Sequence, residues 1–269
     1  MNFSEIININ IPEGVVSKIT TLEGVVLWKK GDSDIVIPDL PTPNYNEIYY
    51  ITTDGKIINP AHPSDIKSNT YTNGIGKITY YYNITEILES TFENERNLLA
   101  IKLPTSVTRL HFRSFYYCTS LININLTDNI IAINSFAFCG CKNIKYIKLP
   151  SNIKQIGEGG FSNCTSLKTV IFNEVLEYIQ PYAFTNCTSL KDIQLYNVKA
   201  IEKNAFSNCT NLSTITSLKL EAPILREKPF ENVGTTVSGS KVLRVPQGAT
   251  GYETWLEQLK GFTIEYITE

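Results

Sequence analysis

The side chains that could catalyse a reaction or bind a metal are few and scattered in this sequence. The two histidines, His62 and His111, lie 49 residues apart, and no Ser/His/Asp or Cys/His arrangement brings a nucleophile to a base. The pair Cys139-Gly140-Cys141 could chelate a metal, but no second cysteine pair or nearby histidine completes a tetrahedral set. Asp32-Ser33-Asp34 lacks the remaining ligands of an EF-hand. The sequence therefore predicts a protein without catalytic residues, cofactor or metal.

Composition and sequence motifs exclude several further classes of ligand. There is no Gly-x-x-x-x-Gly-Lys-Ser/Thr loop, and Gly157–Gly160 lacks the strand-to-helix setting of a dinucleotide site. A formal net charge of −2 offers no basic footprint, so we expect no nucleic acid partner. No stretch approaches the roughly 18 apolar residues that span a bilayer, so we expect no membrane insertion. Residues 1–5 lack the basic and apolar regions of a signal peptide.

The cysteines occur at a regular spacing. Five of the six lie three residues after a phenylalanine that recurs every 22 or 23 residues, and only Cys139 departs from this pattern; the five are Cys118, Cys141, Cys164, Cys187 and Cys209. A buried thiol behaves as a small hydrophobic group with a weak donor, which suits a tight corner that recurs along a chain. We therefore expect free, stacked thiols. The alternative is oxidation between neighbours, since adjacent strands lie only about 4.8 Å apart.

The phenylalanines belong to a repeated phrase. It reads Phe-Ser-Asn-Cys-Thr-Ser-Leu at Phe161–Leu167 and returns, with small changes, at 184–190 and 206–212. Looser copies begin at Phe115 and Phe138, and a degenerate copy begins at Phe92, where Glu95 replaces the cysteine. Successive phenylalanines are 22 or 23 residues apart. A fixed period in this range predicts a solenoid.

Two inward-pointing segments recur in each repeat. A Leu-x-x-Ile-x-Leu pattern alternates at period two and predicts a short strand, as at Leu121, Ile124 and Leu126. A second apolar segment follows at Val107/Leu110, Ile130/Ile133, Ile153/Ile156, Val175/Ile179 and Val198/Ile201. One coil cannot bury its own apolar face, whereas stacked neighbours form a continuous core. The fold class is therefore a β-rich solenoid of about six coils of 22–24 residues.

The repeats divide the chain into five segments. Residues 1–30 form a small β attachment module, and 31–46 form a proline-rich linker. Residues 47–83 form an N-terminal hairpin cap, with one turn expected at Asp54-Gly55 and another at Asn73-Gly74. The solenoid spans residues 84–218. Residues 219–269 hold a degenerate repeat and a C-terminal cap, with an amphipathic helix expected over Tyr252–Lys260.

The phrase Ala-Phe-x-Asn-Cys-x-x-Leu, at 183–190 and 205–212, resembles the BspA-like (Treponema pallidum type) leucine-rich repeat family. The stretch 242–252 looks like the usual terminator of that family. The resemblance implies a curved or flat leucine-rich repeat solenoid that serves adhesion or protein interaction without catalysis. The family occurs in surface proteins of gut and oral bacteria, in parasitic protists, and in viruses that infect gut bacteria.

Phrases within 18–28 and 49–60 look similar to modules that precede such repeats in gut Bacteroidales and their phages. This similarity implies a phage virion component, a fibre or decoration protein, in which residues 1–40 contact other virion proteins. The alternative is a bacterial cell-surface adhesin that lacks its leader.

Between the inward positions, each repeat strand presents two outward residues, and these form the candidate binding face. They are Ala100/Lys102, Asn123/Asn125, Tyr146/Lys148, Thr169/Ile171, Asp192/Gln194 and Thr214/Thr216. Six strands span roughly 25–30 Å, which is wide enough for a protein or a cell-surface glycan, the partners that we expect. Tyr146, Lys148 and Ile171 are the most anchor-like group, since aromatic side chains dominate interface energetics. The alternative is that these are ordinary solvated strand residues.

Overall fold

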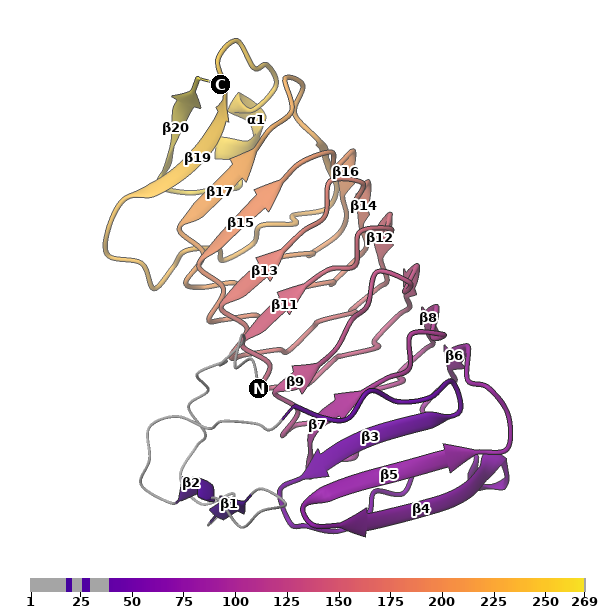
Figure 1. The fold of residues 1–269 in the computed structure, drawn as a ribbon. Coiled ribbons are helices and arrows are strands. Elements are labelled where there is room, and N and C mark those ends of the chain that lie inside the picture. Colours follow the sequence, from indigo (N-terminus) through magenta and orange to yellow (C-terminus); the bar gives the residue numbers. More distant parts are fainter. Residues whose placement is uncertain (1–17, 21–25, 30–38, 269) are drawn as a thin grey trace.

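The computed structural model describes residues 18–20, 26–29 and 39–268 (Figure 1). Most of the predicted attachment module and linker, residues 1–46, therefore lies outside the described residues. Within that part, β1 (Lys18–Thr20) pairs in antiparallel fashion with β2 (Val26–Lys29).

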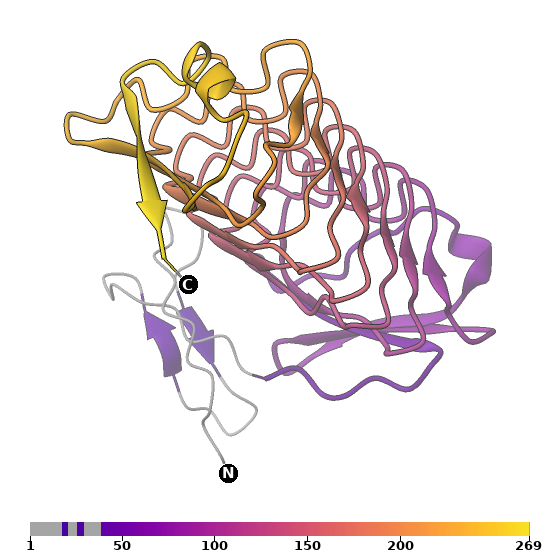
Figure 2. The same cartoon turned by 90° about the horizontal axis from the view of Figure 1, so that it is seen from above.

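The repeats fold into stacked coils that carry two ladders of parallel strands (Figures 1 and 2). The ladder that holds the candidate site, the face ladder, comprises β7 (Leu98–Lys102), β9 (Asn123–Ile124), β11 (Tyr146–Lys148), β13 (Thr169–Ile171), β15 (Asp192–Leu195), β17 (Thr214–Ser217) and β19 (Lys241–Pro246). The back ladder comprises β6 (Glu86–Ile87), β8 (Arg109–Leu110), β10 (Ala132–Ile133), β12 (Gln155–Ile156), β14 (Tyr178–Ile179), β16 (Ala200–Ile201) and β18 (Ile224–Leu225). The predicted β-solenoid is confirmed.

The repeat phenylalanines form one continuous stack through the core. Neighbouring rings from Phe92 to Phe230 have centroids 5.1–5.6 Å apart and planes within 20° of parallel. Each of these rings is fully buried. Phe230 continues the stack, so the predicted degenerate repeat forms a further coil of the solenoid. Stacked rings in adjacent coils stabilise the array beyond the area that they bury.

The asparagine of the repeat phrase occupies a backbone position with positive φ. Two positions in every coil, two residues before and two residues after the phenylalanine, have positive φ. Asparagine and glycine adopt this left-handed region most readily, and the second position holds Asn94, Tyr117, Gly140, Asn163, Asn186, Asn208 and Asn232. The last four also form an amide ladder, in which Nδ2 of Asn186, Asn208 and Asn232 each donates to Oδ1 of the preceding asparagine at 2.9–3.0 Å.

The five aligned cysteines are free and fully buried. Each Sγ donates a hydrogen bond to the carbonyl of the phenylalanine in the preceding coil, at 2.9–3.2 Å, as Cys164 does to Phe138. Burial raises the pKa of all five thiols. The cysteine thus closes the corner between two coils, and a pKa raised in this way keeps the thiol protonated and unreactive.

An antiparallel sheet covers the first coil. β3 (Glu47–Thr52) lies between β5 (Ile75–Tyr80) and β7, and β4 (Ile66–Thr72) forms the outer edge beyond β5. The 3₁₀ turn η1 (Pro63–Asp65) precedes β4. Asn73 and Gly74 both have positive φ and connect β4 to β5, as a two-residue hairpin turn requires.

The expected turn at Asp54-Gly55 forms, but it does not connect two strands of a hairpin. The chain turns there, but β3 pairs with β5 and β7, and residues 56–60 form no strand. Asp54 instead accepts a hydrogen bond from the side chain of Asn97 at 2.9 Å, and the backbone of Asn59 donates to Glu95 at 2.6 Å. These bonds join the turn to the first coil, so the segment after it follows the solenoid instead of folding back on β3.

The C-terminal cap differs in part from the expectation. The predicted helix over residues 252–260 is a single turn, α1 (Glu253–Leu256), and the chain then forms β20 (Phe262–Ile267), parallel to β19. Trp255 is buried, lies 5.4 Å from the ring of Phe230, and donates from Nε1 to the carbonyl of Pro223 at 3.2 Å. Its indole covers the end of the phenylalanine stack.

One predicted inward position of the back segment, Val175, is wrong. Val175 is 40% exposed, and Leu176 is fully buried in its place. Leu176 lies 23 residues after Ile153, so the period itself identifies the buried residue. The exposed Val175 becomes part of the candidate site.

Candidate binding face

The face ladder presents two columns of outward side chains over β11 to β20. The register aligns Tyr146, Thr169, Asp192 and Thr214 in one column. The second column comprises Lys148, Ile171, Gln194 and Thr216, and it continues to Arg244 and Glu265. Tyr146 is 46% exposed and Ile171 is 40% exposed. Strand pairing on both sides holds the central positions of these columns, so their backbone is ordered before a partner binds.

The N-terminal end of the predicted face is covered by the chain itself. Ala100 is buried in a small second cluster with Leu40, Ile51, Leu99 and Ile122. Lys102 is half-buried, and its Nζ donates to the carbonyl of Leu40 at 2.7 Å. Both outward positions of β7 are thus occupied by contacts within the protein, and Lys102 is not free to meet a partner.

Asn125 marks a break in the ladder. Its side-chain Oδ1 accepts from the backbone N–H of Leu103 at 2.7 Å, and its Nδ2 donates to the carbonyl of the same residue at 3.1 Å. Its amide thus takes the place of backbone pairing at the carboxyl ends of β7 and β9. On the other side of β9 the ladder is interrupted, because β9 and β11 belong to different sheets. Asn123, on the same strand, is half-buried. The available face therefore begins at Tyr146.

A hollow of about 470 Å³ adjoins the second column at the carboxyl ends of β11 and β13. Lys148 and Ile171 form its ladder side, and Val175 and Tyr196 add apolar surface. Asp128 and Glu174 supply carboxylates. The backbone N–H of Ser151 donates to Asp128 at 2.8 Å, and this bond lowers the pKa of that carboxyl. Sequence reasoning missed Val175, Tyr196 and Glu174 because they follow the strand, where the repeat pattern is weakest.

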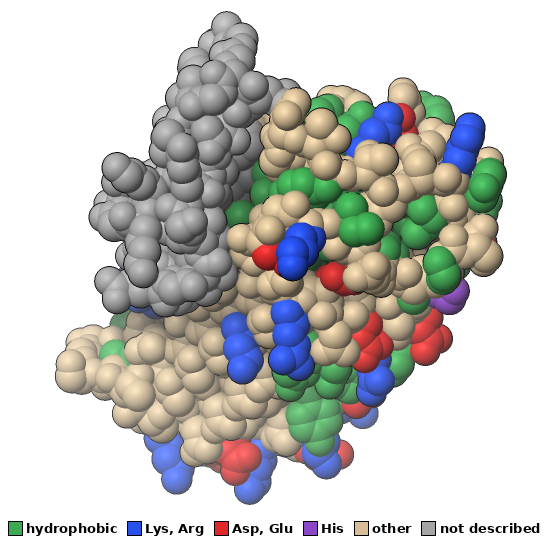
Figure 3. Space-filling model, turned by 90° about the horizontal axis from the view of Figure 1, so that it is seen from below, with side chains coloured by type: hydrophobic (Ala, Val, Ile, Leu, Met, Phe, Trp, Pro, Cys, Tyr) green, Lys and Arg blue, Asp and Glu red, His purple; other side chains and the backbone are tan. Residues whose placement is uncertain are grey.

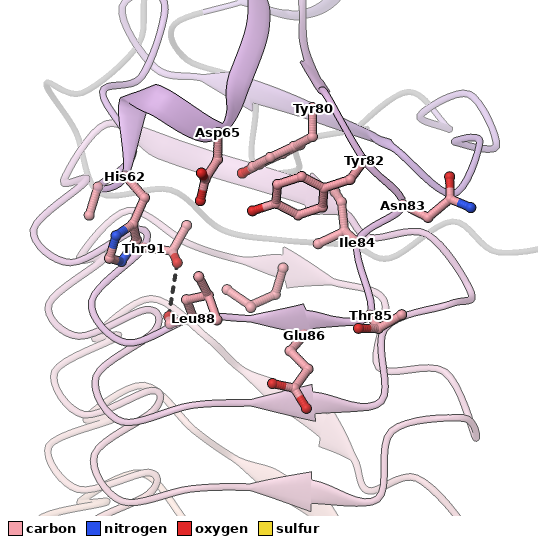
Figure 4. A pocket seen from close by; sticks show the side chains of 12 residues that line it. His62, Asp65, Tyr80, Tyr82, Asn83, Ile84, Thr85, Glu86, Leu88 and Thr91 are labelled. Atoms are coloured by element: carbon pink, nitrogen blue, oxygen red, sulfur yellow. Dashed lines mark hydrogen bonds between the residues drawn. The ribbon is translucent and has the colours of Figure 1, made fainter.

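A second hollow, of about 180 Å³, lies where the cap meets the first coil (Figure 4). Asp65, Tyr80 and Tyr82 point toward one another there, and Glu86 lies on the next strand. Burial raises the pKa of Tyr80. Burial and a hydrogen bond to Asp65 raise the pKa of Tyr82. Both phenols therefore stay protonated near neutral pH and are unsuited to act as bases.

The two histidines are each engaged within the protein. The ring of His62, beside the second hollow, contacts the carbonyl of Glu89 at 3.1 Å, and that of His111 contacts the carboxylate of Glu86 at 2.8 Å. Seen from below, the side on which the cap sheet lies, basic and acidic side chains are interspersed (Figure 3). Across residues 39–268 and the two short strands before them, no group of three potential metal ligands converges. In the same part of the chain, no helix is long and apolar enough to cross a bilayer.

A protein-family model described as BspA type leucine-rich repeat region matches residues 45–157 and 112–235, in six copies. These matches cover more than half of the chain. The protein belongs to this family. The resemblance drawn from the repeat phrase is thereby confirmed at the level of the family.

One solved structure shares this fold. The crystal structure of the T. pallidum leucine-rich repeat protein is 24% identical, covers 70% of this chain and 82% of its own, and has a TM-score of 0.57. A leucine-rich cell surface protein from Faecalibacterium prausnitzii is 21% identical over 78% of this chain and 72% of its own, with a TM-score of 0.44. No curated protein matches the chain.

Proposed function

We propose that this leucine-rich repeat protein is a non-enzymatic binding protein that recognises a protein or a cell-surface glycan on its face ladder. The observation that carries the proposal is the exposed group of Tyr146, Lys148 and Ile171, beside a hollow on a hydrogen-bonded ladder. Large exposed apolar groups on an ordered surface are typical of interaction sites.

The site extends from Tyr146 toward the C-terminus. Thr169, Asp192, Gln194, Thr214 and Thr216 add donors and acceptors around the anchors, and they stay part of the proposed site. Lys102, Asn123 and Asn125 no longer do. The side chains of Lys102 and Asn125 are hydrogen-bonded to the backbone, and Asn123 lies on β9, in a different sheet from β11.

The test compares two double variants with the unmodified protein. Tyr146→Ala with Lys148→Glu alters the face ladder, and Tyr178→Ala with Lys154→Glu alters the back ladder, where Tyr178 is 38% exposed. Fluorescently labelled protein is added to intact gut Bacteroidales cells, and binding is read by flow cytometry. We expect the face variant to lose at least ten-fold in affinity and the back variant to bind normally, since truncated anchors cost about 2 kcal/mol or more each.

Pretreatment of the cells distinguishes a protein partner from a glycan. Binding that disappears when the cells are treated with protease indicates a protein partner, whereas binding lost after periodate oxidation indicates a glycan. Equal binding by the face variant and the unmodified protein, or absence of saturable binding to any strain, would refute the proposal.

The particle or cell surface that carries this protein is a separate proposal. A phage particle, with residues 1–40 contacting other virion proteins, is the first expectation, and the bacterial cell surface is the alternative. None of the proteins compared above is described as part of a virion, so the first expectation rests on the sequence resemblance alone. Capsid and tail genes beside this gene would support it, and surface-polysaccharide or secretion genes would support the alternative.

The attachment role of the N-terminal segment can be tested by deletion. Because Leu40 packs on β7, the deletion should end at residue 38. We expect a folded monomer by circular dichroism and light scattering that no longer assembles. An unfolded product would show that the segment caps the solenoid instead.

A further inference from the structure

The hollow between the cap and the first coil is formed by two parts of the chain that no repeat relates (Figure 4). On the cap side, η1 contributes Asp65, and the end of β5 and the residues after it contribute Tyr80 and Tyr82. On the coil side, β6 and the residue after it contribute Ile87 and Leu88. All the residues that line the hollow are described, and none of them belongs to the two columns of the proposed binding face.

The hydroxyl group of Tyr80 has no hydrogen-bond partner among the described residues. The residue is only 6% exposed, and its side chain points with those of Asp65 and Tyr82 toward the centre of the hollow (Figure 4). A buried tyrosine hydroxyl normally finds a partner. Tyr50, on the adjacent strand β3, does so, since its hydroxyl donates to Oδ1 of Asn69 at 2.6 Å. The Tyr80 hydroxyl is thus free to bond to a group that enters the hollow.

The negative charge of Asp65 is also left without a cation. In the described part of the chain, no ion pair involves Asp65, and no lysine or arginine lines the hollow. The other carboxylate there, Glu86, lies 3.6 Å from Arg109 and 2.8 Å from the ring of His111. Asp65 accepts a hydrogen bond from Tyr82. A carboxylate can accept about four bonds, so this one bond leaves Asp65 with acceptor capacity.

The remaining wall of the hollow is largely apolar. Ile84 and Ile87 are buried beneath it, and Leu88 is 39% exposed at its border. The ring of His62 contacts the carbonyl of Glu89 at 3.1 Å. A volume of about 180 Å³ corresponds to about six water molecules at roughly 30 Å³ each, which also suits a short alkyl chain with one polar end.

We propose that this hollow binds a primary alkylammonium group, the group that ends a lysine side chain or a small free amine. The N–H groups of the ammonium donate to the carboxylate of Asp65 and to the hydroxyl oxygen of Tyr80, and the methylene groups lie against the apolar wall. A quaternary ammonium group has no N–H to offer to Tyr80. A metal ion fits less well, because no three potential metal ligands converge within the described residues.

The experiment titrates the full-length protein with n-butylamine and reads binding from the NMR chemical shifts of isotope-labelled tyrosine rings. Butanol, which is neutral, and tetramethylammonium, which has no N–H, are the comparison probes. We expect butylamine to shift the signals of Tyr80 and Tyr82 with a dissociation constant of about 1–10 mM, as a single small contact group allows. Butanol and tetramethylammonium should each bind at least about ten-fold more weakly, since bonds to charged groups are the stronger ones.

Two pairs of variants separate binding from folding. Asp65→Asn should lose about ten-fold or more in affinity for butylamine, whereas Asp39→Asn, the same change at an exposed position, should lose nothing. Tyr80→Phe should lose about five-fold and keep its midpoint of urea unfolding, because an unpaired hydroxyl does not stabilise the fold. Tyr50→Phe should show the reverse, a lower midpoint and normal affinity, because it loses the bond to Asn69.

Three results would overturn the proposal: no saturable shift at about 100 mM butylamine, tetramethylammonium or butanol binding as tightly as butylamine, or equal losses in Asp65→Asn and Asp39→Asn. A fourth probe, Nα-acetyl-lysine methylamide, identifies the source of the amine. Binding as tight as that of butylamine supports a lysine side chain of a partner protein, and binding of butylamine alone supports a free amine.

This site and the proposed binding face can fail independently. The Tyr146→Ala, Lys148→Glu variant should bind butylamine as the unmodified protein does, because neither residue lines the hollow. Conversely, Asp65→Asn should keep its binding to cells through the face ladder.

Discussion

The buried cysteine column makes the stability of this protein sensitive to mildly alkaline pH. An unfolded thiol loses its proton above a pKa of about 8.5, whereas burial raises the pKa of the folded thiols well above that value. Above pH 8.5 the unfolded chain therefore binds fewer protons than the folded protein, and the free energy of unfolding falls as pH rises. The stabilisation is fully present below that pH and is lost progressively above it.

The size of the effect follows from the number of thiols. Between pH 7.5 and 9.5, each thiol that stays protonated in the folded state costs about 1.4 kcal/mol of stability. The five thiols of the column, all fully buried, together cost about 7 kcal/mol. Domains have only about 5–15 kcal/mol in total, so the protein should be close to unfolding at pH 9.5.

The assay is urea unfolding, monitored by circular dichroism in a reducing buffer at both pH values. Cys164→Ala should unfold more easily at pH 7.5, by about 1–2 kcal/mol, because it loses the bond to the carbonyl of Phe138 and leaves a small void. Its further loss between pH 7.5 and 9.5 should be smaller than that of the unmodified protein by about 1.4 kcal/mol. Burial also raises the pKa of tyrosines, as for Tyr50, to about 12. These tyrosines lower the free energy of unfolding by the same amount in both proteins, so their effect cancels in the comparison.

Two results would refute this reasoning. One is an identical pH-dependent loss in Cys164→Ala and the unmodified protein. The other is thiolate absorbance at 240 nm in the folded protein at pH 9.5, which would show that the thiols titrate without unfolding. Leu220→Ala, at a side chain that is 61% exposed, is the control and should keep the full loss.

Three further substitutions probe the caps and corners, each measured by urea unfolding at pH 7.5. Trp255→Ala should destabilise the protein by about 3–5 kcal/mol by uncovering the phenylalanine stack; a change below 1 kcal/mol would mean that the stack ends without a cap. Gly76→Ala should cost about 1–3 kcal/mol because an added Cβ would overlap the ring of Tyr50, and the paired variant Gly76→Ala with Tyr50→Leu should recover part of it. Asn186→Ala should cost about 1–2 kcal/mol, through its positive φ and the lost amide ladder, whereas Asn186→Gly should cost less. Equal losses in the last two variants would assign the effect to the ladder alone.

Repetition makes much of this architecture readable from the sequence. The neighbour of each coil is another copy of the same coil, so a residue that recurs at a fixed position must contact its own equivalent. Phe161, Cys164 and Leu167 follow this rule: all three are fully buried, and the phenylalanine stacks on its equivalents in both adjacent coils. The outward columns could be deduced in the same way from the alternation along each strand.

The tertiary structure decided the features that depend on contacts with unique segments. No period relates β3 to β7, or Leu40 to Lys102, so the covering of the first coil could not be deduced from the repeats. The same holds for β20, which follows a segment that reads as a helix. At Asn125, an amide that bonds to the backbone of Leu103 removes a predicted contact residue. Beyond it, β9 and β11 belong to different sheets. The physical reason is that a repeat encodes contacts between equivalent residues, whereas the caps and the usable part of the binding face depend on residues that occur once.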